Sequence, residues 1–242
     1  MTEGAAFCVN CGQDRLGAPR PKRLQEPAAA PNFHDRVGLQ GGNAMRLLIS
    51  LLATMFGSTF LILLILPDSD YIMLYAGIAM AISTTLCALP EAEEIRRLFA
   101  IDRVLRPIPW IAAIVVTPFL PLLAELWVAF LDIQESASYD SLEGLTPAMA
   151  LLTIAIMPGI FEELAFRGVV LGNLRHMLSL RNAHLLTAFL FTAIHFSPLI
   201  FPYHFLIALF LGWLRQRSGS LLVPMFAHAL HNAVIVFIYD AA

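Results

Sequence analysis

Two adjacent glutamates inside an apolar stretch are the first residues of this chain that suggest chemistry. Glu162 and Glu163 follow Phe161 and precede Arg167. Because Glu163 and Arg167 are four residues apart, they share a face of a helix and can form an ion pair. Glu162 is rotated by about 100° from that face. A carboxylate that is buried away from a cation has a raised pKa and is suited to accept a proton. The alternative is a helix end at the membrane surface, with all three charges in water.

Histidines and an asparagine occur in two later apolar stretches. His195 closes the first of them, and taken alone it is typical of a packing histidine that hydrogen-bonds a carbonyl. His228 and Asn232 are four residues apart on one face of the second, with His231 beside them. Hydrogen bonds between membrane helices, worth about 0.6 kcal/mol each, are the alternative explanation for this second pair.

Together, these three clusters supply a base, a second proton carrier and neutral hydrogen-bond donors. Such a set can activate water and hold a tetrahedral oxyanion. Each charge at the centre of a membrane costs about 2.5–3.5 kcal/mol on insertion scales, so unpaired charges there indicate a function. The sequence therefore predicts a hydrolytic site between membrane helices.

The three clusters resemble the signature motifs of the CAAX protease and bacteriocin-processing (CPBP, or Abi) family. This family of intramembrane proteases is related to the type II CAAX prenyl endopeptidase. The likeness covers about residues 110–240, with the motifs in the same order and at the same spacing. The residues that carry it are Glu162, Glu163, Arg167, Phe191, His195, His228 and Asn232.

This resemblance implies an all-helical intramembrane endopeptidase that hydrolyses a peptide bond with glutamate-activated water. By motif position, Glu162 is the base and His195 its partner, while His228 and Asn232 form the oxyanion hole. The supporting residues, which fix the helix and tune its charge, are Glu163 and Arg167. His231 is an extra histidine, and if it took the place of His228 in the pocket the roles would shift with it.

A metal-dependent version of the site is the less favoured alternative. The chain has no HExxH motif. Glu162, His195 and His228 could supply a zinc site of two histidines and one carboxylate. Asn232 fits an oxyanion donor better, because an amide is a poor zinc ligand. We therefore expect no cofactor in the membrane domain, with zinc as the alternative.

The first 45 residues differ from the rest of the chain. Cys8 and Cys11 form a CxxC that looks like half of a zinc ribbon, but a second CxxC is absent. Zinc would need two further ligands, and the other interpretation is a degenerate remnant. Repeated prolines over residues 17–31 predict a flexible tail, 1–45, ahead of a membrane domain, 46–242, with its core motifs in 147–240.

The composition explains why membrane helices must position these residues. Hydrophobic residues make up 58% of the 242 residues and charged residues 14%, against about 25% charged in soluble proteins. The sequence has no cluster of basic residues of the kind that binds nucleic acid. The predicted fold class is all-α, a polytopic bundle of about seven transmembrane helices. The predicted spans are 47–66, 71–89, 108–131, 147–163, 183–196, 205–214 and 221–239, and the helix of the fourth is expected to continue past the bilayer toward Arg175.

Three segments of the predicted bundle are expected to differ from a regular transmembrane helix. The charged segment 91–106 reads as an interfacial helix or loop. In the third span, Pro118, Pro121 and Glu125 predict a kink or a polar lining. Short apolar runs within 167–215 leave room for a broken or re-entrant arrangement.

The distribution of basic residues predicts the orientation. Under seven spans, every loop rich in arginine or lysine falls on one side, while the loops 67–70 and 132–146 carry acids alone. The positive-inside rule then predicts a cytoplasmic N terminus and an outside C terminus in a multi-pass protein of a bacterial inner membrane.

Two other functions compete with proteolysis. A membrane scaffold or bacteriocin-immunity protein could use the same fold without catalysis, because fold does not determine function. A small transporter is less favoured, since no inverted repeat is visible. The predicted partners are membrane lipids and a substrate that is a peptide or a membrane protein, with or without a lipid group.

Overall fold

A computed structural model describes residues 33–66, 71–100, 106–131 and 146–240. Every regular element in these ranges is a helix, which confirms the all-α prediction. Cys8, Cys11 and residues 1–32 of the predicted tail lie outside the described residues. Residues 33–45, which were also assigned to the tail, are helical and begin the first helix.

The described residues form α-helices, 3-10 turns and π-helical segments. In chain order they are α1 (Phe33–Ile65), α2 (Ile72–Ala88), η1 (Leu89–Glu91), α3 (Ala92–Arg97), α5 (Pro107–Val116), η2 (Thr117–Phe119), α6 (Leu120–Phe130), α7 (Pro147–Ala150), η4 (Leu151–Ile156), α8 (Met157–Glu163), η5 (Leu164–Val170), α9 (Leu171–Met177), α10 (Leu180–Ala193), α11 (Phe201–Ser218) and α12 (Leu222–Asp240).

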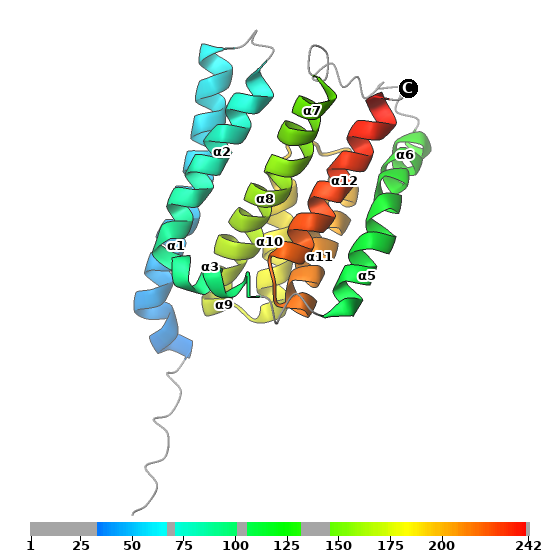
Figure 1. The fold of residues 1–242 in the computed structure, drawn as a ribbon. Coiled ribbons are helices and arrows are strands. Elements are labelled where there is room, and N and C mark those ends of the chain that lie inside the picture. Colours follow the sequence, from blue (N-terminus) through cyan, green and yellow to red (C-terminus); the bar gives the residue numbers. More distant parts are fainter. Residues whose placement is uncertain (1–32, 67–70, 101–105, 132–145, 241–242) are drawn as a thin grey trace, which may run out of the picture.

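The long helices lie side by side in one bundle (Figure 1). α1 and α2 pack against each other at one edge, and α5 and α6 form the other edge. Between them, α8 packs against α12, and α10 packs against α11. α3 lies at the lower end in this view, within the segment that was predicted to be interfacial.

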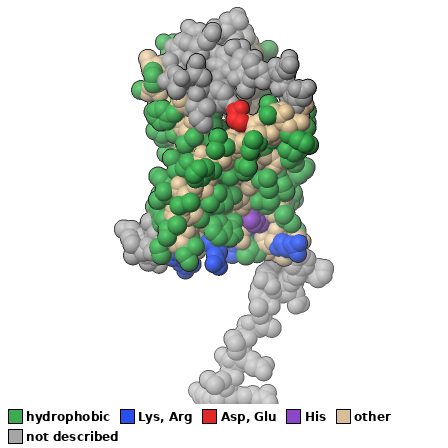
Figure 2. Space-filling model, turned by 90° about the vertical axis from the view of Figure 1, so that its right-hand side faces the viewer, with side chains coloured by type: hydrophobic (Ala, Val, Ile, Leu, Met, Phe, Trp, Pro, Cys, Tyr) green, Lys and Arg blue, Asp and Glu red, His purple; other side chains and the backbone are tan. Residues whose placement is uncertain are grey.

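The outer surface of the bundle is apolar. Large side chains are exposed on the outer helices, among them Phe60 (68% exposed), Leu126 (67%) and Phe130 (78%). Figure 2 shows hydrophobic side chains over the visible face and the described basic side chains at one end of it. So large an exposed apolar surface fits contact with lipid.

Four helices in the described residues are long and apolar enough to cross a membrane. They are Ala44–Ile62, Leu74–Arg97, Pro107–Phe130 and Pro147–Met177. The last three predicted spans lie in α10, α11 and α12, which do not meet the same length and composition criteria; seven spans are therefore not confirmed. With 14 residues, α10 rises about 21 Å, less than a hydrocarbon core of about 30 Å.

Prolines shape the third and fourth spans. Pro118 lies in the 3-10 turn η2, which interrupts the helix between α5 and α6, so the predicted break is present. The helix Pro147–Met177 contains two π-helical segments, η4 and η5, on either side of α8. Pro158 lies in α8 and has no N–H to bond the carbonyl of Ile154, four residues earlier.

A glycine allows α8 and α12 to approach each other closely. A Cβ added to Gly159 would lie 2.8 Å from the backbone nitrogen of Ala229, closer than real Cβ atoms come. Glycine is therefore required at this crossing. The crossing brings the glutamates at the end of α8 beside the polar face of α12.

Candidate active site

One cavity of about 380 Å³ brings the predicted site residues together. Glu162 reaches it from α8, His195 from the turn after α10, and His228 and Asn232 from α12. These elements are well separated along the chain, so their meeting at one cavity results from helix packing. The arrangement supports the prediction that they act together.

Glu163 forms the centre of a buried ion network beside this cavity. Its Oε1 accepts a hydrogen bond from Arg167 Nη1 at 2.8 Å and contacts His228 Nδ1 at 2.9 Å. Glu163 is 0% and Arg167 1% exposed. Arg167 also donates to the Ala208 carbonyl of α11 at 2.9 Å. The predicted pairing of Glu163 with Arg167 is thus confirmed, and it is buried rather than solvated.

The same network determines how His228 is held. A carboxylate can only accept a hydrogen bond, so His228 Nδ1 carries the proton and Nε2 remains for other partners. The link joins residues 65 apart in sequence. It was not predicted, because it depends on the crossing of α8 and α12.

Among the described residues, Glu162 makes no hydrogen bond to this network. It is half-buried, and its Oε2 has no hydrogen-bond partner within the described part of the chain. It lines the site cavity and also a second, larger cavity of about 780 Å³. Glu162 therefore lies where the two cavities adjoin.

The second cavity is mostly apolar and lies between α1, α2 and α8. Besides Glu162 its lining residues are Leu52, Met55, Phe56, Gly57, Thr59, Phe60, Ala76, Gly77, Met80, Thr153, Pro158, Ile194 and Phe196. Phe196 has a positive φ of 48°, which is unusual for an aromatic residue, and its ring packs edge-on against Phe56 at 5.5 Å. Strained backbone of this kind clusters at functional sites.

His195 both packs against its own helix and lines the site cavity. Its Nδ1 lies 2.8 Å from the Phe191 carbonyl, as expected for a packing histidine. A carbonyl only accepts, so Nδ1 carries a proton, and in the neutral ring Nε2 can accept one. The ring lines the site cavity, where this second nitrogen can serve as a proton carrier.

Asn232 also has a structural partner. Its Nδ2 donates to the Ile154 carbonyl at 2.8 Å. This is the carbonyl that Pro158 leaves without its helical donor. A primary amide has two N–H groups, so one remains after this bond is made. Asn232 can therefore support the broken helix and still donate into the cavity.

Three further residues of the cavity were not among the predicted catalytic set. His204 stacks on His195 with ring centroids 4.4 Å apart, and Tyr203 Oη lies 3.1 Å from His231 Nε2. Tyr203 and His204 belong to no motif, and the only available signal was their position at the start of a short apolar run. Glu125 also lines the cavity, as the expectation of a polar lining for its span requires.

Several polar atoms of this cavity lack a hydrogen-bond partner that water could provide. Within the described residues, Glu162 Oε2, His204 Nδ1 and His231 Nδ1 are buried without a hydrogen-bond partner. Buried polar atoms are normally satisfied by protein or by ordered water. A hydrolytic site needs water at the same place.

The described histidine and carboxylate groups around this cavity are not arranged as a metal site. In the described ranges, no three histidine, cysteine, aspartate or glutamate side chains are grouped so that they could hold an ion. This includes Glu162, His195 and His228 as they stand.

Comparison with known families adds an independent observation. Residues 144–234 match the family model "Type II CAAX prenyl endopeptidase Rce1-like". This segment is Rce1-like. The finding confirms the resemblance to the CPBP family, whose members are proteases. Neither the curated proteins nor the solved structures include a match to this chain.

The Rce1-like segment contains the whole predicted catalytic set. It begins before α7 and ends within α12, so all three motifs lie inside it. The helices α1 to α6 lie outside it, although they contribute Glu125 to the site cavity and most of the wall of the apolar cavity.

Proposed function

We propose that this protein is an intramembrane endopeptidase that cleaves a peptide bond with water activated by Glu162. The observation that carries the proposal is the position of Glu162 between two cavities. One cavity holds His195, His228 and Asn232, and the other is apolar and large enough for a substrate segment.

In the proposed reaction, Glu162 takes a proton from water as the water oxygen bonds to the scissile carbonyl carbon. The carbonyl π electrons move to its oxygen and give a tetrahedral oxyanion. His195 assists the proton transfer, and the proton then passes to the leaving nitrogen as the C–N bond breaks. Atoms and charge balance without a further reactant.

The oxyanion is the proposed partner of His228 and Asn232. In the imidazolium form of His228, Nε2–H donates to the oxyanion while Nδ1–H stays bonded to Glu163. Asn232 offers its remaining N–H. Removing one such donor typically lowers the turnover rate 10²–10³-fold, or by about 2.7–4 kcal/mol.

We further propose that the substrate is a peptide or membrane-protein segment that carries apolar groups. The apolar cavity would hold these groups beside Glu162. The family name specifies prenyl endopeptidases, so a lipidated protein is the first candidate. Membrane lipids are the other proposed partners.

The proposed setting is a bacterial inner membrane crossed seven times, with a cytoplasmic N terminus. The clustering of basic loops at one end supports this orientation.

Glu162→Gln is the decisive test of the mechanism. The amide keeps the shape of the side chain but cannot act as the base, so cleavage should fall by at least 10²-fold. Quantitative peptidomics of membranes from cells that express the wild-type or variant protein measures the loss. Glu93→Gln is the matched control, because Glu93 is exposed and far from the site. Full cleavage by Glu162→Gln would reject Glu162 as the base, whereas identical peptidomes from cells with and without the wild-type protein would favour a scaffold.

A cleavage assay with purified protein determines whether a metal is needed. We propose catalysis without a metal, so cleavage by purified protein should persist after dialysis against a strong chelator. Loss of cleavage on chelation, with recovery on addition of Zn²⁺, would instead establish the zinc alternative.

A further inference from the structure

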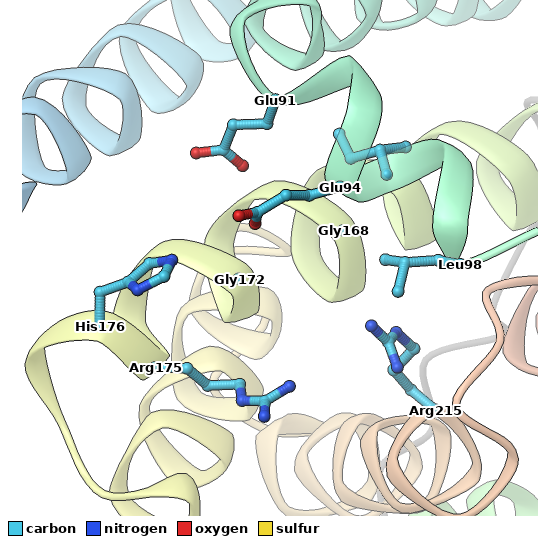
Figure 3. Close-up of a pocket in the computed structure, with 9 residues that line it drawn as sticks. Glu91, Glu94, Leu98, Gly168, Gly172, Arg175, His176 and Arg215 are labelled. Atoms are coloured by element: carbon cyan, nitrogen blue, oxygen red, sulfur yellow. The ribbon is translucent and has the colours of Figure 1, made fainter. Parts of the chain in front are cut away.

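A separate cavity of about 310 Å³ lies at the basic end of the bundle. Its walls come from η1 and α3 on one side and from η5, α9 and α11 on the other (Figure 3). Its volume is near the lower end of the usual range for small-molecule sites, about 300–1,000 Å³. It shares no lining residue with the two cavities around Glu162.

The two walls of this basal cavity carry opposite charges. Glu91 and Glu94 lie on the η1 and α3 side, while Arg175 and Arg215 lie opposite, as Figure 3 shows. Arg215 is 8% exposed and points into the cavity. Arg175 is exposed. An anion alone would meet two carboxylates and a cation alone would meet two guanidinium groups, so a zwitterion fits both walls best.

The acidic wall is held in place by bonds within the protein. Glu91 Oε1 accepts a hydrogen bond from Asn173 Nδ2 of α9 at 2.6 Å. The carbonyl of Leu98, just after α3, accepts from the backbone N–H of Leu221 at 3.0 Å. Glu93 pairs with Arg96 and Arg97, so these arginines are directed away from Glu94. Glu94 is exposed and has no ion pair among the described residues.

A glycine keeps the space between the walls open. A Cβ on Gly172 would meet only Glu91 Oε2, at 3.9 Å, an ordinary contact distance. A small side chain would be tolerated there, and a large one would fill the cavity. The residue therefore offers a way to close the cavity without changing its charges.

The position of the cavity indicates the source of the zwitterion. The cavity lies at the end of the bundle where α3 and α9 lie (Figure 1), and the described basic side chains visible in Figure 2 gather at this end. In a membrane this is the level of the lipid headgroups. A phosphodiester with a primary ammonium has the two charges that the walls require.

We propose that the basal cavity binds the headgroup of a zwitterionic phospholipid of the phosphoethanolamine type. Arg175 and Arg215 hold the phosphate, through charge-assisted hydrogen bonds from their guanidinium groups. Glu94 accepts hydrogen bonds from the ammonium, with Glu91 behind it. A choline headgroup fits less well, because a trimethylated ammonium has no N–H to donate.

Lipid retention by the purified full-length chain in detergent tests this proposal. Native mass spectrometry would compare phosphatidylethanolamine, phosphatidylcholine and phosphatidylglycerol with identical acyl chains. We expect about tenfold stronger retention of phosphatidylethanolamine than of the other two, the effect of about one charge-assisted hydrogen bond. Equal retention of the three lipids by the wild-type protein would overturn the proposal.

Variants assign this preference to the two walls. Arg175→Gln should weaken all three lipids, and Glu94→Gln should remove the preference for ethanolamine over choline. Both residues are exposed, so these variants test the site even if Arg215→Gln fails to fold. Gly172→Leu should abolish retention. Arg217→Gln is the control, since this exposed arginine of α11 does not line the cavity. If Arg175→Gln and Glu94→Gln retained the three lipids as the wild-type protein does, the site would be rejected.

Two further experiments identify the ligand and separate this proposal from the proposed protease mechanism. Soluble glycerophosphoethanolamine should compete poorly with the lipid; competition at equal concentration would identify a free phosphodiester as the ligand and overturn the assignment to a membrane lipid. Glu162→Gln should keep the lipid preference, so failure of the proposed protease mechanism and failure of this lipid site are distinguishable.

Discussion

His228 takes its orientation from Glu163, a residue on another helix. Glu163 holds both His228 and Arg167 with one carboxylate oxygen, and all three side chains are buried. A buried charge without its partner is strongly destabilising. The network therefore both stabilises the α8–α12 contact and prepares His228 for its proposed role.

Replacing Glu163 tests the stabilising part of this role. Glu163→Leu leaves Arg167 charged and without its ion-pair partner in the interior, so the free energy of unfolding should fall by about 3–5 kcal/mol. Denaturant titration in detergent measures it. Glu93→Gln, which breaks an exposed pair, should cost less than about 1 kcal/mol. Equal effects in the two variants would contradict a buried network.

Asn232 has two roles that can be separated by experiment. Asn232→Leu leaves the Ile154 carbonyl without a donor, which should cost about 1–3 kcal/mol of stability. Adding Pro158→Ala restores a backbone N–H to that carbonyl, so thermal unfolding of the double variant should recover. Cleavage by the double variant should stay low, because the oxyanion donor is still missing. Recovery of cleavage would show that Asn232 is structural only.

At the scale of elements, the site depends on how closely α8 and α12 cross. The glutamates end α8 and the histidines lie on α12, so the distance between these helices sets the distance between their side chains. The two π-helical segments beside α8 shift the register of side chains along the same long helix. Neither feature follows from an apolar stretch and its length.

Gly159→Ala tests this crossing. The new methyl group would collide with the backbone of Ala229, so the helices must separate, at a cost of about 1–3 kcal/mol and with loss of cleavage. Thermal unfolding and the cleavage assay measure the two effects. Gly57→Ala serves as the stability control: no atom lies within 4 Å of its new Cβ, and it should stabilise α1 by about 0.5–1 kcal/mol. If Gly159→Ala changed neither thermal unfolding nor cleavage, the tight crossing of α8 and α12 would be contradicted.

At the scale of the whole molecule, the number of membrane crossings decides where the site opens. α10 and α11 are joined by residues 194–200, and Trp127 Nε1 of α6 donates to the Leu199 carbonyl in this connection at 2.8 Å. If both helices cross, this connection lies on the side opposite to the basic loops. A re-entrant pair would place it within the membrane or on the same side.

Single-cysteine labelling distinguishes these arrangements. With Cys8, Cys11 and Cys87 replaced by serine, Arg181→Cys and Arg217→Cys should react with a membrane-impermeant thiol reagent only from the cytoplasmic side. Leu199→Cys, whose side chain is 51% exposed, should react only from the outside. Labelling is read by mass shift in intact and in opened cells. Cytoplasmic labelling of Leu199→Cys would contradict seven spans.

The sequence alone determined what depends on short-range geometry and composition. Apolar stretches predicted the helices, because a lipid environment requires backbone groups to bond within a helix. The spacing of four residues predicted the Glu163–Arg167 pair, since neighbours on a helix face are set by the helical repeat. Motif order predicted the resemblance to the CPBP family, and the Rce1-like match over residues 144–234 confirmed that resemblance for this segment.

Only the tertiary structure decided which side chains from different helices meet. The contact of Glu163 with His228, the donation from Asn232 to the carbonyl freed by Pro158, and the stacking of His204 on His195 all cross between helices. The basal cavity likewise joins η1 and α3 to α9 and α11. Such contacts depend on how side chains fill the space between packed helices, and that packing is a property of the whole bundle rather than of any one segment.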